Sequence, residues 1–357
     1  MKNGKAARIA ASFILLFVII SGCASEKTRP VAENTPDSHA GISFCAAGDV
    51  MLDRGVKNRI DGDGKDFIFE KTAGFIRLKD ISFCNLECPV STRGKRKAGG
   101  YAFRADPVNL SIVKKCGFKV VSLANNHMMD YGEESLTDTF KYLDAEGITY
   151  AGAGQNREKA RAFVIKEVRG VKVAFVADLN MPTIVEEVPE DPALPQPSQK
   201  RSMVELTAEI KKAKLAADIV VVSFHWGVEY THNPQAYQKR LARACIDAGA
   251  DMVLGHHPHV MQGIEIYKGK IILYSMGNLV FDQVKVMTSR TFIFACEFFK
   301  NGTIKNAFIT PVQIVENRPV FARGAVAQEI RALMMKISKG FGTKFEEKDG
   351  RLYLQGL

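Results

Sequence analysis

The sequence predicts an α/β protein, and three observations lead to this fold class. Apolar runs that suit buried strands alternate with amphipathic helical segments from residue 42 to about residue 260. Polar residues follow several apolar runs, at the points where strands would end. Glycine-containing turns join pairs of extended segments in the later part of the chain. Because alternating strands and helices build a sheet covered by helices, we expect one large α/β domain.

The first half of the chain supplies the alternation. Apolar runs that end in turn residues predict strands at residues 42–52, 80–90, 118–127 and 148–154. Amphipathic segments predict helices at residues 105–117 and 132–147. The first of these helices has clear boundaries, because Asp106 can cap its start, Pro107 suits its first position and Gly117 lies past its end. Residues 162–180 predict a hairpin that turns at Arg169-Gly170.

The second half continues the pattern and ends in hairpins. Residues 182–200 contain five prolines and an acidic cluster, which we interpret as a loop that covers a site. Helices at 201–217 and 235–249 alternate with strands at 218–227 and 251–257. Hairpins follow at 262–278 and 291–315, with turns at Lys268-Gly269 and Asn301-Gly302. We expect a domain over residues 42–320, with a C-terminal helix and short strand in residues 321–357 packed on it.

Composition and charge limit the function classes. The chain has 357 residues, 46% hydrophobic and 25% charged, as in a globular protein with a sizeable core. Its net charge of +10 suits anionic lipid or an acidic substrate, although a solvated basic face is the simpler interpretation. The sequence has no basic stripe with interleaved aromatic residues, so we expect no nucleic-acid partner. The six cysteines after Cys23 form no CxxC pair, and we expect buried free thiols.

The N-terminal segment has the features of an export signal. Residues 1–23 combine a cationic start, an apolar core and small residues before Cys23. The ending Ile20-Ser21-Gly22-Cys23 resembles a bacterial lipobox and predicts lipidation of Cys23, with an uncleaved anchor or an ordinary signal as the alternatives. Residues 24–41 are polar and aperiodic, which predicts a flexible tether. We therefore expect an exported lipoprotein, anchored to the outer face of the bacterial membrane.

Side chains that can bind metal recur where the predicted strands end. They are Asp49 with Asp53, Asn85 with Glu87, Asn125, Asn126 and His127 with Asp130, His225 with Glu229, His257 with His259, and Asn278 with Asp282. Sites in open α/β sheets form outside the carboxyl ends of the strands, so these side chains can converge on one crevice. Oxygen and nitrogen ligands without thiolate suit Zn, Mn, Fe or Mg. Each residue alone also has a structural explanation, such as a turn or a core histidine.

Two local features need separate interpretation. Three of the seven histidines lie in VLGHHPHVMQG, residues 253–263. The period-two alternation of a strand predicts that His256 faces away from the site that His257 and His259 would close. Arg54 and Arg104 lie near plausible cleft turns, but we interpret both as solvated surface residues.

The motifs together resemble a known family. They are AAGDVMLDRGV, FCNLECPVST, VSLANNHMMDYG, VVSFHWGVEY and LGHHPHVMQGIEIYKGKIILYSMGNLVFD, in order over about residues 42–285. This series is similar to the CapA-type poly-gamma-glutamate (capsule) synthesis proteins, a family related to the calcineurin-like metallophosphoesterases. The resemblance implies a four-layer αββα sandwich: two mixed sheets face to face, helices outside, and a metal site at one edge.

The resemblance also implies roles for individual residues. The implied metal ligands are Asp49, Glu87, Asn126, His225, His257 and His259. His127 is the implied proton donor, with Asp130 as its orienting partner. The substrate cleft would be lined by Asn125, Glu229, Asn278 and Asp282. The cofactor would be a divalent ion, Mn, Fe or Zn.

Two departures from the phosphoesterase pattern concern the number of ions. Phosphoesterases usually have Asp-x-His in the first motif, where this chain has Asp49-Val50-Met51, so one histidine ligand is missing. Glu87 stands where they have Asp. One ion or two therefore remain alternatives.

Two functions follow from the resemblance and the residues. The first is a lipid-anchored, metal-dependent hydrolase or transferase that acts on an acidic polymer or a phosphoester. The second is a non-enzymatic, polymer-binding scaffold of an export complex, beside membrane-embedded polymer synthase subunits. A structural metal-binding protein is a third alternative. The gathering of polar groups in one crevice favours chemistry, because burying them is costly.

Overall fold

The computed structural model of this protein describes residues 41–181, 191, 193–199, 201–283 and 285–357, all within one compact unit. The predicted signal, Cys23 and nearly all of the tether lie outside the described residues, as does most of the proline-rich loop. Within the described part of the chain, no helix has the length and apolar character needed to cross a membrane.

The larger sheet joins the start of the chain to its end. Among the described residues its strand order is β17 (Lys344–Lys348), β18 (Arg351–Gln355), β15 (Ile304–Val315), β14 (Arg290–Phe298), β1 (Ile42–Val50), β2 (Ile81–Leu86), β3 (Val120–Ser122) and β4 (Thr149–Ala151). The short strands β13 (Asn278–Val280) and β16 (Arg318–Phe321) pair with β1 and β15. The run from β1 to β4 is parallel, whereas β14 is antiparallel to β1, so this sheet is mixed.

The smaller sheet is also mixed. Its order is β11 (Ile264–Tyr267), β12 (Lys270–Leu273), β10 (Met252–His256), β9 (Ile219–Trp226), β7 (Val171–Asn180) and β6 (Val164–Val168). The four central strands are parallel, and the two outer strands close antiparallel hairpins. A separate two-stranded pair joins β5 (Ala153–Gly154) to β8 (Gln196–Pro197).

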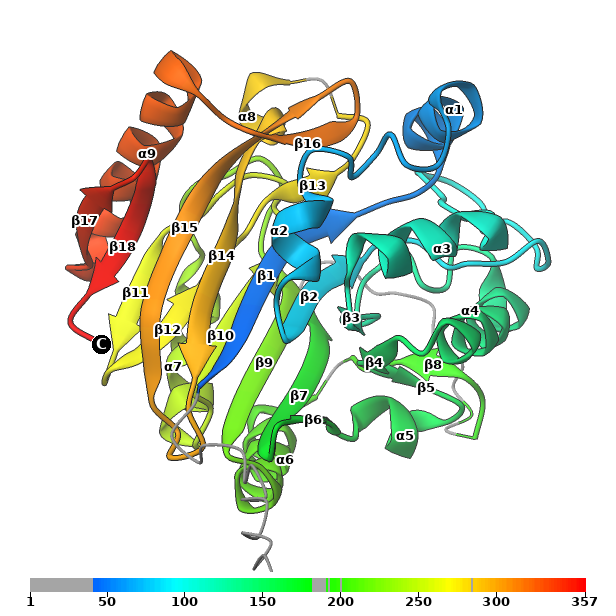
Figure 1. The fold of residues 1–357 in the computed structure, drawn as a ribbon. Coiled ribbons are helices and arrows are strands. Elements are labelled where there is room, and N and C mark those ends of the chain that lie inside the picture. Colours follow the sequence, from blue (N-terminus) through cyan, green and yellow to red (C-terminus); the bar gives the residue numbers. More distant parts are fainter. Residues whose placement is uncertain (1–40, 182–190, 192, 200, 284) are drawn as a thin grey trace, which may run out of the picture. The chain divides into compact units, whose positions relative to one another are not determined.

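Three apolar clusters separate four layers (Figure 1). The middle cluster fills the space between the sheets, where Phe83 of β2 stacks on Phe175 of β7 with ring centroids 5.6 Å apart. The outer face of the larger sheet is covered by α1 (Arg54–Asp63), α2 (Ala73–Arg77), α3 (Pro107–Cys116) and α4 (Gly132–Glu146). The outer face of the smaller sheet is covered by α6 (Met203–Ala216) and α7 (Ala236–Asp247). The expected αββα sandwich is confirmed.

Local sequence signals set many of the boundaries. In α3, the Asp106 side chain accepts a hydrogen bond from the Val108 amide, and Gly117 ends the helix with a φ of 110°. The three predicted hairpins form as β6–β7, β11–β12 and β14–β15. The six cysteines of the described chain are buried and free, as expected.

Several elements were not predicted, and most of them are polar. The helix α1 buries only Val56 and Ile60, and β17 is the exposed sequence KFEEK. Neither segment has an apolar face that a periodicity argument would detect. The other unpredicted elements are short: α2, β16, α5 (Arg157–Arg161) and α8 (Val286–Ser289).

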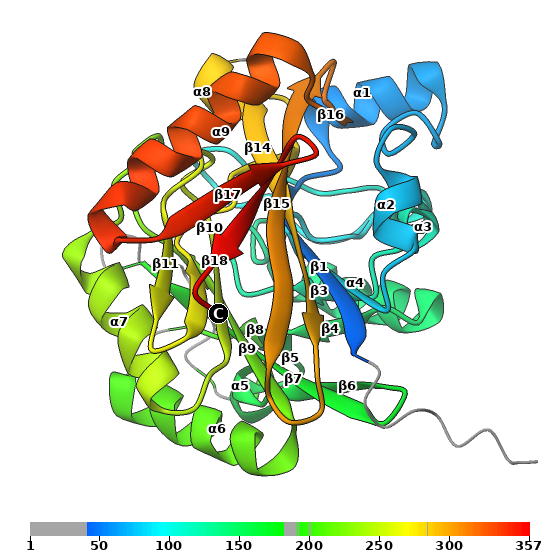
Figure 2. The same ribbon diagram turned by 60° about the vertical axis from the view of Figure 1, so that its left-hand side comes forward.

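The C-terminal segment closes the open edge of the sandwich. The helix α9 (Gly324–Ser338) contacts β15 of one sheet and β11 of the other (Figure 2). Its Ile330 and Met334 belong to the cluster between the sheets. A 3-10 turn, Lys339–Phe341, leads from α9 to the β17–β18 hairpin.

Candidate metal centre

The carboxyl ends of β1 and β2 place two buried carboxylates beside each other. Asp49 pairs in register with Asn85, and Glu87 follows directly after β2. The Asn85 amide nitrogen donates to Asp49 Oδ1 at 2.9 Å and to Glu87 Oε2 at 3.3 Å. It also lies 3.3 Å from His225 Nδ1, which comes from the end of β9 in the other sheet. Asn85 therefore joins the strand ends of both sheets.

Asp49, Glu87 and His225 form a buried group that fits a cation. One ligand atom from each lies within 4.8 Å of the others. Glu87 Oε1 and His225 Nε2 are buried and have no hydrogen-bond partner in the described chain. Unpaired buried polar atoms are costly, and a divalent ion would satisfy atoms of this kind. The donor set of carboxylate oxygen and imidazole nitrogen suits Mn, Fe or Zn.

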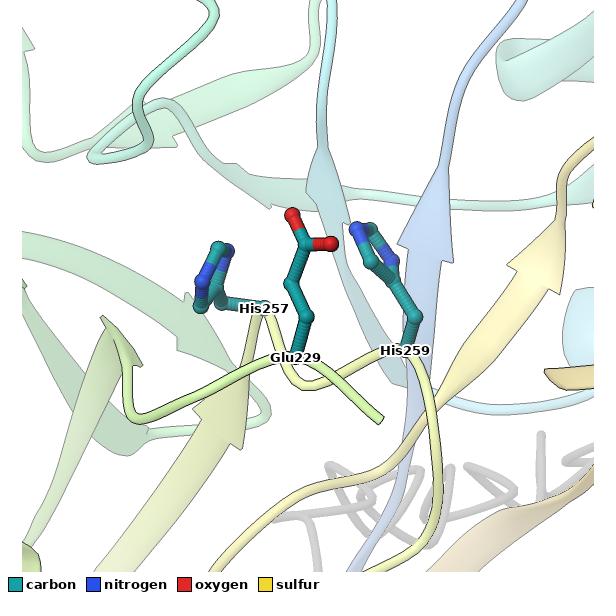
Figure 3. A group of neighbouring side chains, drawn as sticks. All are labelled: Glu229, His257 and His259. Carbon is teal, nitrogen blue, oxygen red and sulfur yellow. The ribbon is translucent and has the colours of Figure 1, made fainter. Parts of the chain in front are cut away.

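His257, His259 and Glu229 form a second group (Figure 3). One ligand atom from each of these residues also lies within 4.8 Å of the others, and His257 Nδ1 is buried without a partner in the described chain. The side chain of Glu229 projects between the two imidazoles. His259 is oriented by Asn278, whose Oδ1 lies 2.8 Å from His259 Nδ1. The two groups meet through Asp49, because its Oδ2 accepts from the His257 amide at 3.3 Å.

The prediction that His256 faces away from the site is wrong. His256 is the last residue of β10, and its Nδ1 lies 3.2 Å from Asp49 Oδ1, although not with hydrogen-bond geometry. Its ring points into the space between the sheets, beside Phe83. The alternation argument failed because His257 and His259 have left the extended conformation, with φ of 94° and 56°. The chain turns there, and all three imidazoles approach Asp49 or its neighbours.

Burial and charge move the pKa values of the site in opposite directions. Burial alone would raise the pKa of Asp49, but His256 and His259 hold it well below its usual range. Burial, and then the charge of Asp49, raise the pKa of Glu87 well above its usual value. Burial lowers the pKa of His225 far below its usual value, and that of His257 to about 3. Neutral imidazoles are the form that binds metal.

His127 sits at the junction between the buried carboxylates and solvent. Its Nδ1 lies 2.7 Å from Asp130 Oδ2, and its Nε2 lies 3.9 Å from Glu87 Oε1. Phe103 packs on the ring with centroids 4.1 Å apart. The neighbouring Asn126 has a buried Oδ1 without a partner in the described chain, as an amide ligand of an ion would.

A cavity of about 260 Å³ opens beside this centre. Of the predicted site residues, it is lined by His127, Glu229, His259 and Asp282. Asn125 and Asn278 are buried behind the ligands: Asn125 bonds Asn85, Leu86 and the His127 amide, and Asn278 bonds His259. The remaining lining residues are Arg54, Tyr101, Phe103, Tyr230, Phe281, Gln283 and Lys285.

Arg54 is part of this cavity, which corrects its interpretation as a solvated surface residue. Its guanidinium makes two hydrogen bonds to Asp282, of 2.9 and 2.7 Å. It also lies 5.0 and 5.1 Å from the ring centroids of Tyr101 and Phe103. No local motif could identify this arrangement, since Arg54 and Asp282 are 228 positions apart.

Comparison with known proteins identifies the family. Residues 43–283 match the family described as "Bacterial capsule synthesis protein PGA_cap". The chain belongs to this family. The matched region contains every candidate ligand, from Asp49 to His259, and the whole cavity except Lys285. The resemblance of the motifs to the CapA-type capsule synthesis proteins is confirmed.

Two curated relatives of this capsule synthesis protein span most of its length. It is 32% identical to the "Capsule biosynthesis protein CapA" of Bacillus anthracis, over 96% of this chain and 84% of that protein. It is 31% identical to the "PGA biosynthesis protein CapA" of Bacillus subtilis (strain 168), over 95% and 88% respectively. A solved structure of a hypothetical protein from Thermus thermophilus aligns with a TM-score of 0.48 at 18% identity, covering 76% of this chain and 98% of that one.

Proposed function

We propose that this capsule synthesis protein is a metal-dependent hydrolase or transferase that acts on an anionic substrate, a phosphoester or an acidic polymer. One observation carries the proposal. Three buried ligand-type atoms, Glu87 Oε1, His225 Nε2 and His257 Nδ1, have no protein partner in the described chain. Glu87 Oε1 lies 3.9 and 3.8 Å from His127 and His259, which line the cavity. A protein without a cation here would leave these buried atoms unsatisfied, at a cost of about 1–3 kcal/mol each.

The ligands would be Asp49, Glu87, Asn126, His225, His257 and His259. The bound ion would supply Lewis-acid chemistry, making water a better nucleophile and offsetting negative charge on the substrate. The protein itself prepares the site for this. It buries the carboxylates, keeps His225 and His257 in the neutral form and orients His259 through Asn278.

His127 is the proposed proton donor to the leaving group. Asp130 holds Nδ1, and Nε2 lies 3.3 Å from Asn126 Nδ2 and 3.9 Å from Glu87 Oε1, in a side chain that lines the cavity. Asp130 also accepts a hydrogen bond of 2.7 Å from the Phe103 amide, so the same carboxylate fixes the ring that packs on His127. A donor held in one orientation contributes to catalysis without reorganising during the reaction.

The cavity and the relatives support an anionic substrate. Lys285 and the proposed cation supply positive charge at the cavity, where Arg54 is paired with Asp282, and the names of the two Bacillus relatives refer to capsule or PGA biosynthesis. We further propose that Cys23 anchors the protein to the outer face of the membrane, next to membrane-embedded polymer synthase subunits. The alternative, a non-enzymatic scaffold for polymer export, requires no proton donor.

The test is replacement of His127 in the full-length protein, purified in mild detergent and supplied with Mn²⁺. Hydrolysis of phosphoester and gamma-glutamyl substrates should fall by about 10²- to 10⁴-fold in His127→Ala, the usual contribution of an acid or base. His232→Ala is the matched control, because His232 bonds the Met261 carbonyl at 2.7 Å and is not part of the cavity lining. Equal activity in His127→Ala and wild type would contradict the proposed role, and a wild type that binds no metal would favour the scaffold.

A further inference from the structure

We infer that Glu229 is a direct ligand of a second divalent ion, which it holds together with His257 and His259. This inference rests on the proposed metal-dependent function and deepens it. It replaces the expected role of Glu229 in the substrate cleft and makes the centre a two-ion site. Asp49, Glu87 and His225 are the central ligands of the other ion site.

The backbone holds Glu229 next to the two histidines. The Tyr230 amide donates a 2.8 Å hydrogen bond to the carbonyl of Pro258, the residue between His257 and His259. Tyr230, His257 and His259 all have positive φ, of 61°, 94° and 56°. Non-glycine residues rarely adopt this conformation, because it is strained for a residue with a side chain. The fold therefore gives up stability to bring these two turns together.

The side chains then converge. Figure 3 shows the Glu229 carboxylate between the imidazoles of His257 and His259. The ligand atoms of the three residues lie within 4.8 Å of one another. His257 is only 2% exposed, and its Nδ1 has no hydrogen-bond partner in the described chain. This buried, unsatisfied nitrogen is independent evidence for a ligand, because a carboxylate near the surface would not by itself indicate one.

Met51 follows Asp49 by two positions but contributes no ligand to either group. It stands where the related phosphoesterases usually have the histidine of the first motif. Its side chain belongs to the apolar cluster on the outer face of the larger sheet, and its sulfur accepts from the Asp53 amide at 3.1 Å. No metal ligand comes from that position. Glu229 approaches from the loop after β9, beside the other group.

The proposed second position has two imidazoles and one carboxylate as ligands. With Asp49 and Glu87, Glu229 brings the number of carboxylates to three. Carboxylate oxygen favours harder ions, and imidazole favours Zn and its neighbours. Two imidazoles and one carboxylate suit Zn or Fe as well as Mn, and Mn²⁺ is the probe ion because electron paramagnetic resonance detects it.

The experiment measures metal stoichiometry and does not depend on turnover. The full-length protein, purified in mild detergent, is stripped of metal and titrated with Mn²⁺, in wild type, Glu229→Ala and Glu229→Gln. Glu70→Ala is the matched control, because it removes an exposed carboxylate that pairs with Lys71 and Arg318. Electron paramagnetic resonance of the loaded proteins distinguishes two coupled Mn²⁺ ions from one isolated ion.

Wild type and Glu70→Ala should each bind two ions with a coupled spectrum. Glu229→Ala should bind one, with the spectrum of an isolated ion. Glu229→Gln should keep the second ion with affinity reduced at least about 10- to 100-fold, the range seen even for outer-shell partners of metal ligands. The same stoichiometry and affinity in wild type and Glu229→Ala would overturn the role of Glu229 but leave the metal-dependent function intact. No binding in any variant would overturn both.

Discussion

At the residue scale, the candidate centre depends on neighbours that oppose the effect of burial at one carboxyl and add to it at another. Asp49 and Glu87 are both fully buried, yet the pKa of the first is lowered and that of the second is raised. The difference arises because His256 and His259 lower the pKa of Asp49 against the effect of burial, whereas the charge of Asp49 adds to the effect of burial on Glu87. A bound cation would favour the ionised form of Glu87. Because the charge of Asp49 disfavours ionisation of Glu87, a cation bound between the two carboxyls would stabilise the pair more than it would stabilise either carboxyl alone.

Another buried carboxyl, that of Asp178, makes stability depend on pH. It accepts a 2.7 Å hydrogen bond from the Ser198 hydroxyl, and Arg201 Nε lies 3.5 Å away. Burial raises the pKa of Asp178 to about 6, against the opposing charge of Arg201. Because the folded pKa exceeds the unfolded value, the penalty for the ionised form is full above about pH 6 and disappears as the pH falls toward 4.

The test compares wild type with Asp178→Asn in urea unfolding at pH 4 and pH 7. The free energy of unfolding of wild type, relative to Asp178→Asn, should be higher at pH 4 by up to about 3 kcal/mol. Other titrating groups are common to both proteins and cancel in this difference. A difference that is the same at the two pH values would show that Asp178 ionises as freely in the folded state as in the unfolded chain.

At the element scale, one short segment aligns the two sheets at the site. Residues 274–277, between β12 and β13, bond both ligand-bearing strands: the Asp49 amide donates to the Gly277 carbonyl, and the Met276 amide donates to the Gly255 carbonyl, each at 3.0 Å. The approach is possible only because Gly48 and Gly255 lack side chains. A Cβ atom would lie 1.9 Å from the Gly277 oxygen in one case and from the Tyr274 oxygen in the other. The glycines before Asp49 and His256 are thus packing requirements of the centre.

Gly255→Ala tests this requirement. The added methyl group would meet backbone and Trp226 Nε1, neither of which can move freely, so the variant should lose about 1–3 kcal/mol of stability or more. Mn²⁺ affinity should fall as well, because His256 and His257 follow directly. Gly74→Ala in α2 is the control: nothing lies within 4 Å, and alanine there should be neutral or slightly stabilising. Denaturant unfolding gives both values, and equal stability of the two variants would refute the packing argument.

At the scale of the whole molecule, the domain extends beyond the region that matches the family. The match ends at residue 283, whereas β14 begins at Arg290 and lies next to β1 in the larger sheet. β18 extends the same sheet beyond β15, and its Leu352 and Leu354 enter the cluster between the sheets with Ile330 and Met334 of α9. The C-terminal segment is part of the core.

Deletion of residues 324–357 should therefore prevent cooperative folding. It would remove four buried apolar side chains from the inter-sheet cluster and expose the edge of β15. Near-ultraviolet circular dichroism and thermal unfolding of the truncated and full-length proteins measure the effect. A truncated protein that unfolds cooperatively at the wild-type temperature would show that the segment is an independent addition. Deletion of only the last two residues, Gly356 and Leu357, is the control, because both are exposed.

The sequence by itself determined most of the strands, the three hairpins, the capped helix α3 and the residue types at the strand ends, and the resemblance of its motif series to a known family implied the αββα layering. These depend on periodicity, turn residues and motif order, which are properties of short segments. The tertiary structure decided the position of His256, the bond between Arg54 and Asp282 and the place of Glu229 between two histidines. His257 contacts Asp49 across 208 positions of the chain, and Glu229 reaches its neighbours through a turn held by Pro258. Such contacts depend on how the two sheets pack against each other, and a pattern within one short segment does not predict them.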